Sequence, residues 1–364
     1  MKILYITTIG GTMNFFKDFI KSLIDSGNEV DIATNEVNSK VGDCYREWGC
    51  NVYPISCTRS PISKGTFKAI GEIKRIVSQN GYDIVHCHTP VAAMCTRLAC
   101  KKLRKKGLRV IYTAHGFHFY KGAPKKNWLL YYTIEKMCSK HTDVLITINK
   151  EDYGLAKRKM KAAKVAYVPG VGINLDKFSV SGINKEAKRC ELGIPENSIL
   201  LLSVGELNGN KNHETVIRAI AGIESVYYVI AGMGSLEEHL KSVIHEVGLN
   251  DRVKLLGYRN DIAELCCTAD VFVFPSFREG LSVSVMEAMA SGLPVVCSKI
   301  RGNTDLIDEK GGALFDPHSI EECRSKINSL ISVDIKAAGE YNAEKVKSFS
   351  QETVSRMMRE IYGV

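Results

Sequence analysis

Short apolar runs alternate with stretches of helical period along the whole chain. Apolar runs of about four to eight residues between turn residues are typical of buried strands, and apolar positions three and four residues apart are typical of helices. In the first half, this pattern predicts strands at residues 2–7, 29–34, 51–55, 84–88, 110–114, 144–147 and 165–168. It predicts helices between them, among others at residues 13–26, 67–79, 91–105 and 128–140.

The second half restarts the same alternation. It predicts strands at residues 199–204, 227–231, 253–256, 271–274 and 295–297, and helices at residues 213–221, 236–247, 261–269, 283–291 and 319–330. A final helical stretch at residues 335–361 is long, and we expect it to break near Phe349 or Ser350. Such alternation indicates parallel sheets with crossover helices on both faces. The sequence therefore predicts an α/β fold with two Rossmann-like domains that face each other across a cleft.

The domain boundary is predicted in Pro169-Gly170-Val171-Gly172 and the polar stretch that follows, through Ser181-Gly182. We expect an N-terminal domain of residues 1–172, joined by the C-terminal helix of residues 345–364, and a C-terminal domain of residues 173–344. A chain of 364 residues agrees with two domains of about 100–200 residues each. Ligands of open parallel sheets bind at the carboxyl ends of the strands, so we expect the ligand site in the loops that follow strands.

The composition indicates the cellular compartment of the protein. The 12 cysteines include no C-x-x-C pair, and the opening apolar run at residues 1–6 is too short for the core of a signal peptide. No stretch approaches the roughly 18 apolar residues of a membrane-spanning helix. These features predict a cytoplasmic protein with reduced thiols, which leaves open that it lies against a membrane.

The net charge of +9 is unevenly distributed. Residues 97–164 hold 18 Lys and Arg against 4 Asp and Glu, including the clusters 101–106 and 157–161. This asymmetry predicts an anionic partner for one face, and nucleic acid and anionic lipid are both candidates. We find no basic platform interleaved with aromatic residues and no nucleic-acid-binding motif.

Two loops of the first half carry candidate chemistry. Gly10-Gly11 follows the first strand and precedes a predicted helix, whose free N–H groups favour an anion. It is no G-x-G-x-x-G motif, because Phe15 and Phe16 stand where the closing glycine would be, and it is equally compatible with a tight turn. His115-Gly116-Phe117-His118-Phe119 follows another strand and is either a polar site or an ordinary loop.

A metal site is not expected. His86 and His88 should share one face of their strand while Cys87 points to the other, since successive strand residues alternate. No carboxylate or thiolate cluster completes a set of ligands.

Two loops of the second half follow strands in the same way. Residues 204–212 contain Gly205, Glu206 and Lys211, and a lysine that enters a helix beside small residues can neutralise a phosphate. Gly232 belongs to a second strand-to-helix glycine turn, which alone is a weak signal.

The most informative segment is residues 274–295. A strand is followed by a loop with Glu279-Gly280 and then by a helix with Glu287 about one turn inside it. Glu287 could accept hydrogen bonds from vicinal hydroxyls, and the free N–H groups of the first helical turn could bind a diphosphate.

Taken together, these motifs resemble the retaining glycosyltransferases of family 4, which have the GT-B fold. Glu279 and Glu287 match the family's E-x7-E motif, Gly10 and Gly11 its glycine loop, His115 its cleft histidine and Lys211 its phosphate-binding lysine. The run from His115 to Tyr120 resembles a bacterial subgroup that builds capsule, exopolysaccharide and other polyprenyl-linked glycans.

The resemblance implies an acceptor-binding N-terminal domain and a donor-binding C-terminal domain. Glu287 would hold the donor ribose, Glu279 the transferred sugar, and Lys211 the leaving diphosphate, while His115 would contact sugar hydroxyls. His115, Glu279 and Lys211 are thus the implied catalytic residues. The implied donor site contains Gly11, Glu206, Lys211, Gly232, Tyr258, Arg259, Ser276, Gly280, Leu281, Ser282 and Glu287. Such enzymes need no metal and no cofactor, and the UDP-sugar is their substrate.

Two positions depart from the family pattern. Glu206 stands where an arginine usually pairs with the lysine, and Ser282 stands where proline is common. An acid cannot neutralise a diphosphate, so another cation should help Lys211. Arg259 and Arg301 are the candidates.

The resemblance thus implies transfer of a sugar from a UDP-sugar to a lipid-linked acceptor in bacterial surface glycan synthesis. The basic N-terminal domain would lie on the anionic inner face of the cell membrane, and no nucleic-acid partner is expected. The alternatives are a UDP-sugar epimerase of similar fold, a basic nucleic-acid-binding protein and a Rossmann oxidoreductase. The incomplete glycine fingerprint disfavours the last of these.

Overall fold

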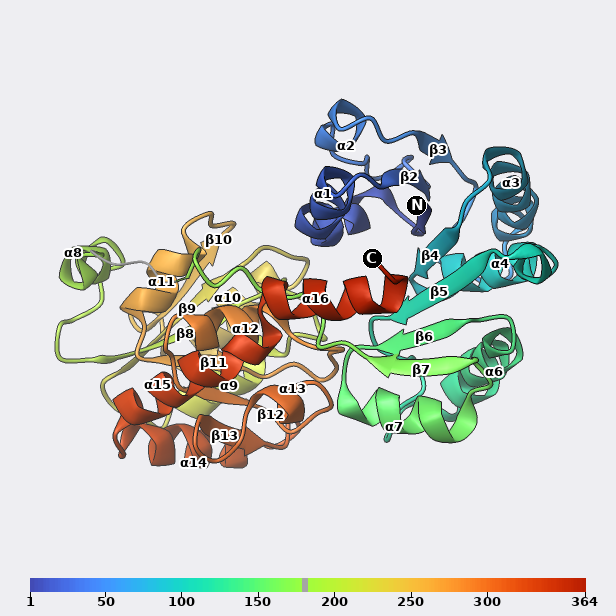
Figure 1. Ribbon diagram of the computed structural model, residues 1–364. Coiled ribbons are helices and arrows are strands. Elements are labelled where there is room, and N and C mark those ends of the chain that lie inside the picture. Colours follow the sequence, from blue (N-terminus) through green and yellow to red (C-terminus); the bar gives the residue numbers. More distant parts are fainter. Residues whose placement is uncertain (179–182) are drawn as a thin grey trace. The chain divides into compact units, whose positions relative to one another are not determined.

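A computed structural model describes residues 1–178 and 183–364 (Figure 1). Contacts between residues divide the chain into two compact units. The first unit contains Met1–Val171 and Val354–Val364, and the second contains Gly172–Thr353. The chain thus enters the second unit at Gly172 and returns at Val354, later than the expected residue 345. Ser181 and Gly182, part of the predicted boundary, lie outside the described residues.

The first unit is built on a seven-stranded parallel sheet with the order β3-β2-β1-β4-β5-β6-β7. Its strands, all predicted, are β1 Lys2–Ile6, β2 Glu29–Thr34, β3 Val52–Pro54, β4 Ile84–His88, β5 Arg109–Ala114, β6 Val144–Thr147 and β7 Lys164–Tyr167. Parallel pairing requires each strand to be followed by a crossover, which the helices provide.

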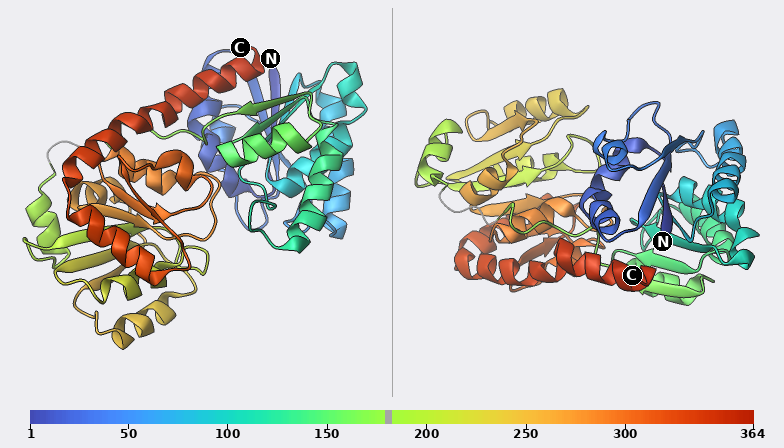
Figure 2. Two further views of the ribbon diagram at one scale, coloured as in Figure 1. Left: turned by 90° about the horizontal axis from the view of Figure 1, so that it is seen from below. Right: turned by 45° about the horizontal axis from the view of Figure 1, so that its top comes forward.

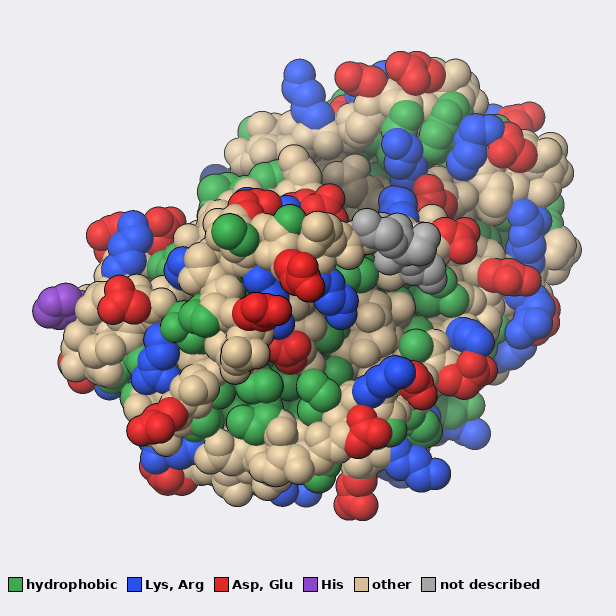
Figure 3. All heavy atoms as spheres, turned by 90° about the vertical axis from the view of Figure 1, so that its left-hand side faces the viewer, with side chains coloured by type: hydrophobic (Ala, Val, Ile, Leu, Met, Phe, Trp, Pro, Cys, Tyr) green, Lys and Arg blue, Asp and Glu red, His purple; other side chains and the backbone are tan. Residues whose placement is uncertain are grey.

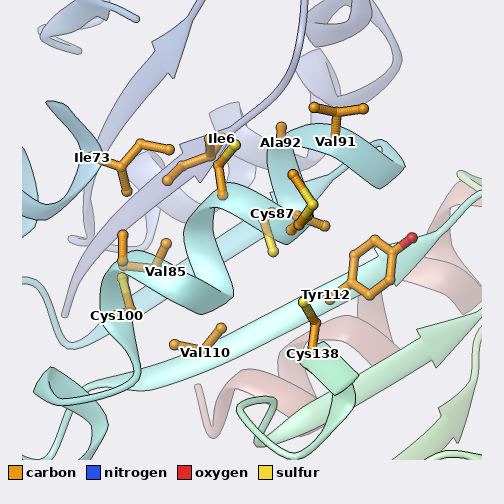
Figure 4. Close-up of a cluster of buried hydrophobic side chains, with 14 of the residues drawn as sticks. Ile6, Ile73, Val85, Cys87, Val91, Ala92, Cys100, Val110, Tyr112 and Cys138 are labelled. Atoms are coloured by element: carbon orange, nitrogen blue, oxygen red, sulfur yellow. The ribbon is translucent and has the colours of Figure 1, made fainter. Parts of the chain in front are cut away.

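Helices cover both faces of this sheet. One face carries α3 Lys64–Asn80, α4 Pro90–Cys100, α6 Thr133–Ser139 and α7 Lys150–Lys159. In the core beneath them, Ile73 of α3, Ala92 of α4 and Cys138 of α6 surround Val85 and Val110 of the strands (Figure 4). The other face carries η1 Gly10–Phe16, α1 Lys17–Asp25 and the C-terminal helix α16 Gln351–Tyr362.

Several element boundaries differ from the prediction for local reasons. The glycine loop itself belongs to the 3-10 helix η1, which begins at Gly10, so the α-helix begins only at Lys17. Helix α3 begins earlier than predicted because the Ser63 side chain caps the N–H of Thr66. The predicted helix at residues 91–105 ends as α4 at Cys100 and is followed by the short turn η2 Leu103–Lys106. Residues 125–139 are continuously helical, with α5 Lys125–Asn127, a π-helical turn η3 Trp128–Tyr132 and then α6.

The second unit is drawn in green-yellow to red in Figure 2. It is built on a six-stranded parallel sheet with the order β10-β9-β8-β11-β12-β13. Its strands are β8 Ile199–Val204, β9 Val226–Ala231, β10 Val253–Gly257, β11 Val271–Phe274, β12 Val295–Ser298 and the unpredicted β13 Gly312–Phe315. Its helices are α8 Lys185–Glu191, α9 His213–Ile220, α10 Glu237–Glu246, α11 Ile262–Thr268, α12 Val283–Ala290, α13 Asn303–Leu306, α14 Ile320–Ile331 and α15 Ile335–Lys345.

The packing of the last helices explains why the chain returns to the first unit only at Val354. Helix α15 stays with the second unit because the buried Asn342 amide donates to the carbonyls of Leu293 and Gly311, at 2.8 and 2.7 Å. The long helix breaks where predicted, through η4 Val346–Phe349 and Ser350, before α16 begins. Among the described residues, none of the helices combines the length and the apolar character needed to cross a bilayer.

Candidate active site

Three loops meet at the carboxyl edge of the second sheet. Strands β8, β11 and β12 are neighbours in this sheet and run parallel, so the loops after them emerge side by side. These loops are residues 205–212 after β8, residues 275–282 after β11 and residues 299–302 after β12. They carry most of the residues that the E-x7-E and lysine motifs single out.

An ion pair joins the first two loops. The Lys211 ammonium lies 2.8 Å from a carboxylate oxygen of Glu279, and both side chains are about four-fifths buried. The same ammonium lies 4.7 Å from the centre of the Phe274 ring. A Cβ atom on Gly205 would come within 3.3 Å of the Lys211 stem, so this glycine leaves room for the lysine. Lys211 lies in the loop two residues before α9, so it precedes the helix that was predicted to begin at residue 213.

Hydrogen bonds from two asparagines fix the relative position of these loops. The Asn210 carbonyl accepts from the N–H of Phe277 at 2.8 Å, and the Asn210 amide donates to the Arg278 carbonyl at 3.0 Å. The Asn212 amide donates to the Pro275 carbonyl at 3.1 Å. No role was predicted for either asparagine, because a polar loop residue carries no signal of the partner it will find.

Arg301 brings the third loop into the same place. Its guanidinium Nε donates to the Glu279 carbonyl at 3.1 Å, and only 7% of the residue is exposed. The next residue, Gly302, has φ 79°, and a Cβ atom there would lie 2.3 Å from the Gly280 carbonyl oxygen. A glycine is therefore needed for the third loop to approach the second so closely.

Glu287 lies in the second turn of α12, after the loop that carries Glu279. The Ser282 side chain caps this helix by accepting from the N–H of Val285 at 3.3 Å, so a serine has a structural use where the family often has proline. Burial raises the pKa of Glu287 from 4.5 to about 7, although the nearby Lys177 opposes the shift. A carboxyl group held away from water in this way is a strong acceptor once it ionises.

The other predicted donor residues of this unit are more dispersed. Tyr258 and Arg259 follow β10, the edge strand, and the Arg259 guanidinium is held by Asp261 at 2.7 Å and Glu191 at 3.1 Å. Arg259 therefore does not join Lys211, and of the two candidate cations only Arg301 contacts the Glu279 loop.

The remaining residues of the predicted donor site are mostly packed against other parts of the protein. A Cβ atom on Gly232 would lie 1.9 Å from the Gly205 carbonyl oxygen. The absence of a side chain at position 232 therefore lets the two loops pack together. Ser276 and Leu281 are buried, whereas Glu206 is exposed.

Gly11 and His115 belong to the first unit. A Cβ atom on Gly11 would lie 2.4 Å from the Ser39 side-chain oxygen, which gives this glycine a packing reason. His115 follows β5, and its Nε2 lies 3.1 Å from Nδ1 of His88. Burial lowers the pKa of His115 to about 4, so the ring is neutral at pH 7.

His115 belongs to a chain of buried polar rings. His86 bonds to the Tyr362 hydroxyl at 2.5 Å and to the Thr113 hydroxyl at 2.8 Å, and Tyr362 lies 2.7 Å from the Tyr5 hydroxyl. His86 and His88 point to one face of β4 while Cys87 joins the core of the other face, as the alternation predicted. Within the described parts of the chain, no three His, Cys, Asp or Glu side chains are grouped so that they could hold a metal ion.

Two family models match the chain. Residues 184–346 match the model described as glycosyl transferases group 1, and residues 2–149 match the model described as glycosyl transferase 4-like. EpsD of Bacillus subtilis (strain 168), which is named as a glycosyltransferase, is 35% identical over 100% of this chain and 96% of its own length. The UDP-Gal:alpha-D-GlcNAc-diphosphoundecaprenol alpha-1,3-galactosyltransferase of Escherichia coli is 33% identical over 77% of this chain and 73% of its own length.

Solved structures share the fold. HepE of Anabaena, in complex with UDP, superposes with a TM-score of 0.82 at 20% identity over 100% of both chains. Sucrose-phosphate synthase of Thermosynechococcus elongatus superposes with a TM-score of 0.81 at 21% identity over 100% of this chain and 98% of its own. The predicted GT-B arrangement of two parallel-sheet α/β domains is confirmed.

The raised pKa of Glu287 makes stability depend on pH. Between pH 4.5 and about 7, the unfolded carboxyl ionises while the folded one keeps its proton, so the free energy of unfolding falls as pH rises. Glu287→Gln removes this loss, and we expect it to stabilise the chain by up to about 3 kcal/mol at pH 8 and by little at pH 4.5. Thermal unfolding at both pH values measures the difference.

The matched control is Glu224→Gln, which changes an exposed glutamate. We expect it to alter the unfolding temperature by the same small amount at both pH values. A stabilisation by Glu287→Gln that is equal at pH 4.5 and pH 8 would contradict the raised pKa.

Proposed function

The chain belongs to family 4 of the glycosyltransferases, and we propose that it transfers a sugar from a UDP-sugar to a lipid-linked saccharide with retention of configuration. The acceptor would be a polyprenyl diphosphate saccharide, and the product an intermediate of a bacterial surface polysaccharide. The observation that carries the proposal is the convergence of Lys211, Glu279 and Arg301 at the carboxyl edge of the second sheet. This arrangement combines two cations with an acceptor of sugar hydroxyls.

The names of relatives and neighbours support the donor and the acceptor. The Escherichia coli relative is named for transfer from UDP-galactose to a diphosphoundecaprenol-linked sugar. HepE was solved in complex with UDP and with UDP-glucose. Both names agree with a UDP-sugar donor here, and the first agrees with a lipid-linked acceptor.

The ribose and the diphosphate of the UDP-sugar each have partners in the proposed site. The ionised Glu287 carboxylate would accept from the two ribose hydroxyls. The diphosphate would be stabilised by Lys211, by Arg301 and by the free N–H groups at the start of α12. Arg301 would then supply the charge that Glu206 cannot, although it reaches the site from a different loop. Because these side chains supply the positive charge, we expect transfer to need no divalent metal and to persist in EDTA.

The transition state separates a positively charged sugar ring from a negatively charged diphosphate. Cations and N–H groups that are already aimed at the diphosphate lower this barrier without reorganisation. The bond from the anomeric carbon to the diphosphate oxygen breaks, and the acceptor oxygen bonds to the same face. The acceptor proton passes to the leaving phosphate oxygen, so no protein base is required.

Two further side chains would position the sugar. Glu279 would accept from its hydroxyls near the reacting face, and the neutral His115 ring can donate or accept one hydrogen bond. Neither residue needs to exchange a proton during the reaction.

A thermal shift screen and a transfer assay, both with a panel of nucleotide-sugars, test the function. In the screen, we expect a UDP-sugar, rather than a GDP- or ADP-sugar, to raise the unfolding temperature. In the transfer assay, we expect this UDP-sugar to be consumed only when a polyprenyl diphosphate saccharide is present. A ligand at 100 times its Kd stabilises a protein by about 2.7 kcal/mol, which a thermal shift detects readily. Release of an isomerised UDP-sugar without acceptor would instead identify an epimerase and contradict the proposal.

Lys211 can be tested by its separate effects on turnover and binding. We expect Lys211→Ala to lower kcat about 100- to 1000-fold, as removal of one preorganised donor to a developing charge usually does. The KM for the acceptor should change little, and Lys211→Arg should retain part of the activity because it keeps the charge.

The control for this series is Lys336→Ala, which changes an exposed lysine of α15 and should leave kcat unaltered. Arg301→Met should lower kcat in the same direction as Lys211→Ala. An unchanged kcat in Lys211→Ala would remove this lysine from the proposed role.

A further inference from the structure

An exposed stripe on the helical segment 125–140 combines apolar and basic side chains. It contains Lys126, Leu129, Leu130, Lys136, Met137 and Lys140, all of which are exposed. Leu129 is 78% exposed and Met137 is 57% exposed. No acidic residue belongs to the stripe, because Glu135, the only acid of the segment, is buried.

The opposite side of the segment is anchored and cannot turn outward. The Glu135 carboxylate forms a buried ion pair with Arg97 of α4, with one contact at 3.1 Å. Tyr131 and Ile134 line a small pocket, and the Tyr131 ring lies 4.6 Å from that of His118. Releasing Glu135 would leave a charge buried and unpaired, which is strongly unfavourable. Leu129 and Leu130 are therefore held in contact with solvent.

A second group of exposed apolar residues lies on the other rim of this pocket. Pro61 lines the pocket, and Ile62, which follows it, is 76% exposed. Phe67, in the first turn of α3, is 63% exposed. Arg59, Lys64 and Lys68 beside them are also exposed. The pocket is also lined by Gly116–Phe119 of the loop that follows β5.

The two basic clusters of the sequence meet at the far end of the same segment. The Arg104 guanidinium donates to the Lys140 carbonyl at 3.2 Å, and the N–H of Lys161 donates to the Ser139 hydroxyl at 2.9 Å. The clusters 101–106 and 157–161 therefore extend the stripe with further positive charge. On the side of the molecule drawn in Figure 3, by contrast, acidic and basic side chains are interspersed.

We propose that this surface is the membrane-docking face of the first unit and that it lies in the headgroup layer of an anionic bilayer. The docking face consists of Ile62, Phe67, Leu129, Leu130 and Met137 together with the lysines and arginines around them. Apolar side chains that point outward among basic ones are typical of segments that lie in a membrane interface. Nucleic acid would attract the basic residues but would leave the leucines and the methionine in water.

The docking face lies on both sides of the pocket that Gly116–Phe119 line, and these residues belong to the loop that begins with His115. A lipid-linked acceptor in the bilayer would therefore approach this loop from the membrane side, which deepens the proposed function and rests on it. The lipid chain would remain among the other lipids while its saccharide is presented to the loop.

Flotation of the full-length chain with vesicles tests the docking face. We expect the wild type to float with phosphatidylcholine vesicles that contain about 30% phosphatidylglycerol and much less with pure phosphatidylcholine. The double substitution Leu129→Glu/Leu130→Glu should lower the bound fraction about tenfold, since it places two acids in the interface. Ile62→Glu/Phe67→Glu should act in the same direction, and both variants should keep the wild-type unfolding temperature because the changed residues are exposed.

The matched control is Val333→Glu, which changes an exposed apolar residue of the second unit and should float like the wild type. A wild type that stays in the aqueous fraction, or double variants that float as well as it does, would overturn the docking face. Binding to duplex DNA that survives the leucine substitutions, without vesicle binding, would assign the basic surface to nucleic acid instead.

An activity measurement separates this inference from the proposed function. In both double variants, turnover on a long-chain acceptor in vesicles should fall relative to turnover on a short-chain, water-soluble acceptor. Flotation as predicted without transfer to either acceptor would leave the docking face standing and refute the acceptor assignment. An unchanged ratio of the two turnovers would refute delivery of the acceptor through the docking face.

Discussion

The parallel pairing of β8, β11 and β12 brings the ends of three loops to one edge of the second sheet. Each loop contributes one of the three charged residues Lys211, Glu279 and Arg301, and the pairing of the strands brings these residues together. Lys211 meets Glu279 across the first two loops, and Arg301 reaches the backbone of the second from the third. Glycines at 205 and 302 leave space for these approaches. A Cβ atom at position 302 would lie 2.3 Å from the Gly280 carbonyl oxygen, so a larger residue there would push the third loop away from the second.

The ion pair between Lys211 and Glu279 has two consequences for the proposed reaction. It holds the lysine ammonium in place, so that a diphosphate need not order a flexible side chain. It also means that Glu279 must share or release the lysine before it can accept a bond from the sugar. Arg301 carries a second positive charge into the site, because its Nε donates to the Glu279 backbone carbonyl. In the proposed site, Arg301 would supply from another loop the charge of the arginine that the family usually has after the Gly205 position.

The sequence predicted the strands and most helices well, since buried strands and amphipathic helices leave a periodic trace. It missed β13, which is only four residues long and begins with glycine. Glu279 and Glu287 could be singled out because their spacing forms a motif, and Lys211 because it precedes a helix after a glycine loop. Their mutual contacts were not predictable, because Lys211 and Glu279 are 68 positions apart in the chain. For the same reason the sequence left Arg259 and Arg301 equivalent, whereas the structure pairs Arg259 with Asp261 and Glu191.

In the proposed reaction the diphosphate leaves from the same face that the acceptor attacks, and Lys211, Arg301 and the start of α12 stabilise its charge. The configuration of the new glycosidic bond, read by NMR from the product of an α-linked UDP-sugar, tests this geometry. We expect an α-linked product, in which the anomeric proton and carbon keep the coupling of the donor. A β-linked product would require attack from the opposite face with a protein base and would rule out the proposed reaction.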